Sequence, residues 1–141
     1  MSGVAITRYL LANNANLVAA VAAANIKAGT IPLNSVLPAL GINEATGEAH
    51  NNIPMNSDKV LITERVRVRV NAKDSATASG YKTQKTILEL VRKALPNTHG
   101  TVNGHEVDSI LPDTTGPDEY DADAAIYSQT RDFIVKFAVT R

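Results

Sequence analysis

The stretch that decides the fold is Lys59–Ala72, which reads Lys-Val-Leu-Ile-Thr-Glu-Arg-Val-Arg-Val-Arg-Val-Asn-Ala. Apolar residues, mostly β-branched, occupy alternate positions from Val60 to Val70, and Glu64 alone interrupts them. Polar residues fill most positions in between. Because successive side chains of a strand point to opposite faces, this alternation predicts a long strand that is packed on one face and solvated on the other.

Upstream of this strand, residues 4–24 predict helical structure that is interrupted by a run of asparagines. Asparagine is a poor residue inside a helix and a good N-cap, so one helix is expected to about Ala12. A second, alanine-rich helix follows, capped by Asn14 or Asn16. Residues 36–42 then predict a short edge strand, because proline near its start cannot donate to a β-ladder.

The rest of the chain predicts two long loops that separate one helix and two strands. The first loop is polar, and the second is acidic and broken by glycine and proline. The segments are a loop at 45–57, a helix at 76–95 capped by Asp74 or Ser75, a strand at 106–111, a loop at 112–125 and a strand at 126–140.

The predicted order of helix, strand, strand, helix, strand, strand indicates an α+β fold. We expect a mostly antiparallel sheet with two helices packed on one face and long loops between the strands. A chain of 141 residues fits one domain of ordinary size, so residues 1–141 are expected to form a single domain.

Charge is segregated along the chain although the net charge is zero. Lys59–Lys93 holds nine basic and three acidic residues, and Glu106–Asp123 holds seven acidic and no basic residues. One hypothesis is that the two runs attract each other between copies of the protein. It assigns to the subunit interface Arg65, Arg67, Arg69, Asp118, Glu119, Asp121 and Asp123. The alternative is that both runs are solvated or pair within one subunit, for example an arginine with Asp132.

No pattern in the sequence predicts catalysis, a metal site or a cofactor. There is no nucleophile elbow, phosphate-binding glycine loop or dinucleotide fingerprint. His99 and His105 could in principle bind zinc, but they and His50 are more simply exposed loop residues. The acidic loop lacks the glycine and glutamate spacing of a calcium site. No cysteine, signal peptide or membrane-spanning segment is recognised, which predicts a soluble, cytoplasmic protein.

An arginine ridge on the long strand also raises contact with nucleic acid. Because the chain has no tryptophan and no net positive charge, this interpretation ranks below subunit contact.

The order of these segments resembles the tail-terminator, or tail-completion, proteins of long-tailed bacteriophages. The likeness extends over nearly the whole chain and has no sharp signature motif. It is carried by residues 10–21, 26–32, 37–40, 66–72, 87–95 and 127–133.

The resemblance implies a structural virion protein without catalytic residues. Such proteins form a ring, typically a hexamer, that ends the tail tube and meets the head–tail connector protein. The expected partners are therefore other copies of the chain, the tail tube protein and the connector, with DNA passing through the ring unrecognised. The long loops are the candidates for partner contact, at Glu48, His50, Asn52, Met55 and Asp113.

Three other interpretations remain open from the sequence. The nearest is another neck component of the same particles, either a head–tail connector or a head-completion protein. The others are a small metal- or ligand-binding protein and a nucleic-acid-binding protein.

Overall fold

The computed structural model describes residues 2–32, 34–51 and 58–140. The helices are α1 (Ser2–Ala12), α2 (Ala15–Ala20) and α3 (Gly80–Ala94), with a 3-10 turn, η1, at Ala23–Asn25. The strands are β1 (Ile26–Ala28), β2 (Ala39–Asn51), β3 (Lys59–Ala72), β4 (Gly100–Val102), β5 (His105–Thr115), β6 (Glu119–Asp121) and β7 (Ile126–Thr140).

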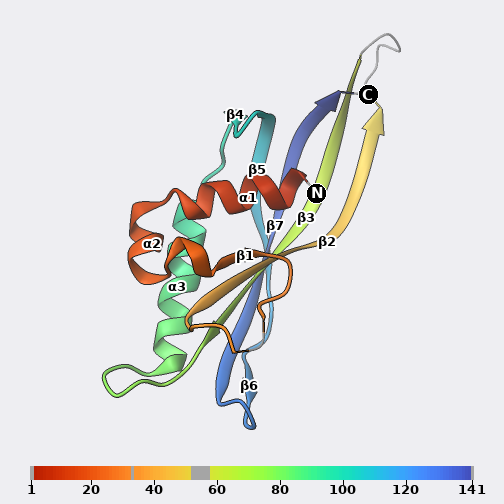
Figure 1. Ribbon diagram of the computed structural model, residues 1–141. Coiled ribbons are helices and arrows are strands. Elements are labelled where there is room, and N and C mark those ends of the chain that lie inside the picture. Colours follow the sequence, from red (N-terminus) through yellow and green to blue (C-terminus); the bar gives the residue numbers. More distant parts are fainter. Residues whose placement is uncertain (1, 33, 52–57, 141) are drawn as a thin grey trace.

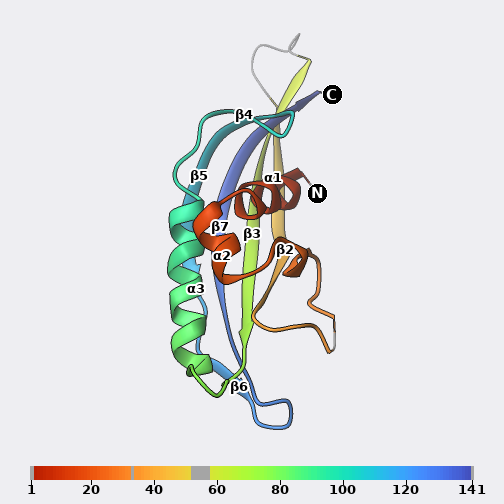
Figure 2. The ribbon, with the colours of Figure 1, turned by 60° about the vertical axis from the view of Figure 1, so that its left-hand side comes forward.

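The strands form one bent sheet in the order β1-β2-β3-β7-β5-β4, and β6 pairs with β7 beside this path. Every pair is antiparallel except β1 with β2. The helices lie together on one face of the sheet, and its other face carries no helix among the described residues (Figures 1 and 2). The predicted α+β class is confirmed.

The two strands with the clearest alternation, β3 and β7, pair at the centre of the sheet. Val66 lies opposite Phe133, and the alternate residues on either side also face the helices. There they pack against the apolar face of α3. The fully buried residues of this core include Val66, Val68, Val70, Ile87, Val91, Phe133 and Val135. Burial of each large apolar side chain contributes about 1.5–3 kcal/mol, which makes this layer the main source of stability.

The helix ends follow local capping rules only in part. Asn14 is the N-cap of α2, and its Oδ1 accepts a hydrogen bond from the backbone N–H of Leu17 at 3.0 Å, as one of the two predicted caps requires. The predicted start of α3 is wrong, because residues 75–78 form a separate hydrogen-bonded turn. Asp74 instead reaches forward to accept the N–H of Gly80 at 2.7 Å.

A buried carboxylate explains the interruption of the β3 pattern at Glu64. Glu64 is 1% exposed, and its Oε2 accepts the backbone N–H of Gly3 at 3.2 Å. The first N–H groups of a helix have no partner within the helix, and its N-terminus favours negative charge. Glu64 therefore fixes the start of α1 over the sheet. A Cβ at position 3 would lie 2.6 Å from Glu64 Cδ, so a side chain there would displace the Glu64 carboxylate.

Both predicted loops are shorter than expected, because strands enter them. β2 continues to Asn51, and β5 and β6 occupy much of 112–125. β1 was not predicted, and β2 begins only at Ala39. From Glu44 to Ala49 the side chains of β2 are exposed on both faces, so this half of the strand has no apolar alternation to reveal it.

Candidate assembly surfaces

The helix-free face of the sheet carries the arginine row predicted from the sequence. Arg65, Arg67 and Arg69 lie on β3, and each forms an ion pair within the chain. The partners are Asp113 at 3.0 Å, Asp132 at 2.9 Å and Glu119 at 3.4 Å, respectively. Pairing within one subunit, the alternative considered for this row, is therefore present. A further role for the three arginines between copies remains a prediction.

Arg67 and Asp132 form the best-defined of these pairs. Arg67 Nε donates to Asp132 Oδ1 at 2.9 Å, and Nη2 donates to Oδ2 at 3.1 Å. The two residues are direct neighbours across β3 and β7, and Asp132 is only 4% exposed. This two-point hydrogen bond raises the pKa of Arg67. The pair fixes both side chains in the sheet and leaves Arg67 half exposed.

Half of the predicted acidic group is held against α3 and β3 of its own chain. Asp118 accepts hydrogen bonds from Lys85 at 2.5 Å and from the Tyr81 hydroxyl at 3.1 Å. The pKa of Asp118 is lowered, chiefly by the hydrogen bond from Lys85. Lys85 also donates to Gln129 on β7, and Glu119 pairs with Arg69. Residues 118 and 119 thus fasten the start of β6 to the body of the protein.

The other half of that group, Asp121 and Asp123, lies at the tip of the β6–β7 hairpin and is exposed. Among the described residues, neither forms a salt bridge. Asp121 Oδ1 accepts the N–H groups of Asp123 at 3.0 Å and Ala124 at 3.3 Å, which shapes the turn. The hairpin forms the lower end of the molecule in Figure 1. Two carboxylates and three alanines (122, 124 and 125) therefore form this tip.

Three of the four tyrosines form a cluster at the base of this hairpin. The rings of Tyr120 and Tyr127 have centroids 4.5 Å apart, and Tyr81 meets Tyr127 edge-on at 6.2 Å. Tyr81 is 42% and Tyr120 53% exposed. The charge of Asp74 is the main cause of the raised pKa of Tyr127. Exposed tyrosines are enriched at protein interfaces, which makes this cluster a candidate contact surface. Sequence reasoning missed it because the three rings come from different elements and meet only in the fold.

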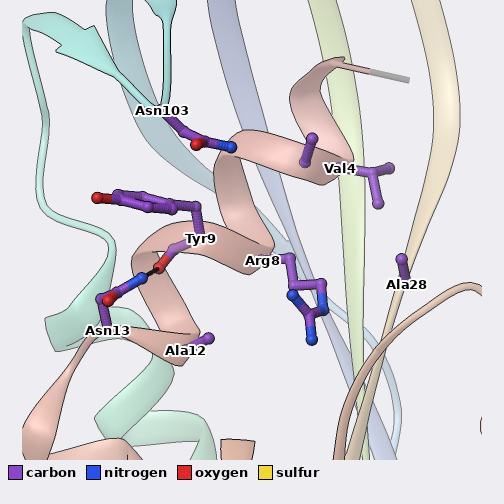
Figure 3. A pocket seen from close by; sticks show the side chains of 8 residues that line it. Val4, Arg8, Tyr9, Ala12, Asn13, Ala28 and Asn103 are labelled. Carbon is purple, nitrogen blue, oxygen red and sulfur yellow. Dashed lines mark hydrogen bonds between the residues drawn. The ribbon is translucent and has the colours of Figure 1, made fainter. Parts of the chain in front are cut away.

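A hollow of about 270 Å³ runs along the exposed side of α1 (Figure 3). Its lining is mostly small and apolar, and it includes one charged side chain, Arg8. Arg8 Nε donates to the carbonyl of Ile26 at 3.1 Å, and no acidic side chain pairs with Arg8 in the described part of the chain. The lining residues are Val4, Ala5, Arg8, Tyr9, Ala12, Asn13, Ala28 and Asn103.

Of the five residues predicted to contact partners from loops, the three that the structure describes lie in strands. Glu48 and His50 belong to β2, and Asp113 belongs to β5, where it pairs with Arg65. Asn52 and Met55 lie outside the described residues. The expected loop setting of Glu48, His50 and Asp113 is wrong, because β2 and β5 extend further than the polar sequence indicated. Contact with a partner at the five positions remains a prediction.

The histidines do not come together with acidic residues into a metal-binding group within the described ranges. His105 lies at the start of β5, and His99 precedes β4. No described helix is long and apolar enough to cross a membrane.

Comparison with known proteins gives a likeness to a solved structure. No family model matches the chain, and no curated protein matches it. Among solved structures, the chain is similar to a chain of a structure described as the virion of a native gene transfer agent particle. The TM-score is 0.68 at 12% sequence identity, and the match covers 98% of this chain and 97% of the other. At this identity the likeness shows a shared fold.

Proposed function

We propose that this protein is a structural component of a phage-like virion. The observation that carries the proposal is the end-to-end likeness to a virion chain, which leaves almost no residue of either chain unmatched. The match extends over nearly the whole chain, so it includes the segments that form the long β2–β3 pair and the β6–β7 hairpin. The resemblance of the sequence to tail terminators points to the same kind of particle.

Within such a particle, the role that we propose is that of a tail terminator. Copies of the chain form a ring, six in number as is typical of that family, at the end of the tail tube. The ring provides the surface that the head–tail connector protein meets, and DNA passes through it. The protein acts without catalysis, metal or cofactor, and it is assembled into the virion in the host cytoplasm.

A closed ring requires two different and complementary surfaces on each copy. Two observations support such a pair of surfaces. The hairpin tip presents carboxylates that have no salt bridge among the described residues, and the hollow beside α1 presents an arginine that likewise has none. Contact of Arg65, Arg67 and Arg69 with an adjacent copy is a separate proposal, tested by charge reversal of these residues.

The role at the tail end is tested with tail tubes assembled in the absence of the protein. Addition of purified protein is expected to place a ring at one end of each tube and to make the tubes competent to join heads. Rings that fail to bind tubes but bind the connector or the head would instead identify the other neck role, that of a connector or head-completion protein.

A further inference from the structure

The hollow beside α1 is a surface site with an incomplete set of interactions. Its walls combine a valine and three alanines with a tyrosine, two asparagines and Arg8. Arg8 uses Nε for the Ile26 carbonyl, which holds the guanidinium at the edge of the hollow (Figure 3). Arg8 and Lys27 are the only charged side chains between Met1 and Asn43. The N-terminal segment that forms most of the hollow therefore contributes only positive side-chain charge.

The β6–β7 hairpin tip has the opposite character. Its residues 121–125 alternate between aspartate and alanine and end in a second alanine. The turn is held by hydrogen bonds to Asp121 Oδ1, and its base is braced by the packing of Tyr120 on Tyr127. A segment already held in one conformation loses little entropy on binding. The tip is thus a stiff, narrow projection with small side chains and negative charge.

We propose that the hairpin tip of one copy docks into the hollow beside α1 of the next copy. Alanine side chains enter the apolar hollow, and Asp121 and Asp123 approach Arg8. Tyr120, half exposed at the edge of the hairpin, covers the contact from one side. This inference rests on the proposed ring, and it names the surfaces that close it.

The position of the two surfaces requires a contact between different copies. The hairpin lies at one end of the molecule and α1 lies over the other half of the sheet (Figures 1 and 2). A tip of one copy in the hollow of the next is a heterologous contact, which repeats around an axis and closes into a ring when the rotation allows. Charge decides the occupant, because Arg8 and the two aspartates have opposite charges and none of the three forms a salt bridge within the described ranges.

The first test exchanges the charges. Arg8→Glu, and separately Asp123→Lys, should each raise the concentration for half-assembly by about tenfold or more in light scattering, and Asp121 is kept because its Oδ1 holds the turn. Combining the two substitutions in one chain restores opposite charges and should bring assembly back toward wild type. Arg8→Lys loses the Nε donor but keeps the positive charge. Because the proposed contact depends on that charge, near-normal assembly is expected. Thermal unfolding of each variant identifies any loss of folding.

The second test uses the absence of cysteine in the chain. Ala5→Cys together with Ala122→Cys should give a ladder of covalent multimers on mild oxidation, and each single variant should not. The inference is overturned if wild-type protein forms rings while the charge exchange gives no recovery or the double-cysteine chain gives no ladder. If wild-type protein forms no ring at all, the proposed function fails, and this contact fails with it.

Discussion

Arg67 on β3 donates two hydrogen bonds to Asp132 on β7, directly across the strand pair at the centre of the sheet. Asp132 is 4% exposed, whereas Arg67 is half exposed. The two partners therefore differ in what their loss would cost. Removal of Arg67 leaves a buried carboxylate without its charge partner, which destabilises the folded protein more than removal of an exposed charge does.

Arg67→Ala is expected to lower the free energy of unfolding by about 1–3 kcal/mol, a range reduced from that of fully buried pairs because Arg67 is half exposed. Arg69→Ala is the matched control, two residues away on the same face. Its pair with the exposed Glu119 spans 3.4 Å, so the expected loss is under about 1 kcal/mol. Urea denaturation measures both. Equal losses would mean that the burial of Asp132 has no energetic weight.

The fastening of β6 should respond to acid. Because the pKa of Asp118 is lowered in the folded protein, its contribution to stability is present above the ordinary value of 3.8 and is lost as pH falls through the lower folded value. The protection factors of the Glu119–Asp121 amides, which correct for the intrinsic pH dependence of exchange, should therefore fall at the acidic end of that window. Asp118→Asn should remove this step, and a step that persists in this variant would assign it to another group.

The contact between Gly3 and Glu64 predicts an unusual response to alanine. Alanine is favoured over glycine in a helix by about 1 kcal/mol. Here the added Cβ would collide with Glu64 Cδ, so Gly3→Ala should destabilise the protein by about 1–3 kcal/mol. In a Glu64→Ala background the same substitution should become neutral or stabilising. Thermal unfolding of the four proteins gives the coupling, and strictly additive effects would contradict the proposed collision.

The cap of α2 offers a direct comparison of two asparagines. Asn14→Ala removes the acceptor for the Leu17 N–H and should cost about 0.5–2 kcal/mol. Asn16 lies inside α2 and is exposed, so Asn16→Ala should be neutral or slightly stabilising. Chemical denaturation of both variants decides between them. A larger loss of stability for Asn16→Ala than for Asn14→Ala would contradict the assignment of Asn14 as the N-cap.

The sequence predicted those elements whose pattern is set by one buried face. β3 and β7 alternate because helices cover one side of the sheet, and α3 shows helical spacing for the same reason. The outer half of β2 escaped prediction because its side chains are exposed on both faces. Pro112 suggested a loop, yet it lies in β5. Beyond residue 107, β5 pairs only with β7 among the described residues, so Pro112 lies on an edge of the sheet, where proline is tolerated.

The candidate surfaces were predictable only as charges, not as contacts. The sequence separates basic and acidic runs, but it does not show which members pair within the chain. Across the sheet, Asp113, Asp132 and Glu119 are neighbours of the three arginines only because of strand register. The hollow beside α1 and the tyrosine cluster each combine segments that are distant in sequence. Their recognition therefore needed the fold.

The measurement that tests the central claim most directly is the mass of the purified protein in solution, by light scattering over a range of concentrations, with negative-stain images of the same samples. The account predicts one closed species of about six times the 15.0 kDa subunit, seen as a ring with a central opening. Protein that stays monomeric at the highest concentration and shows no rings would contradict it.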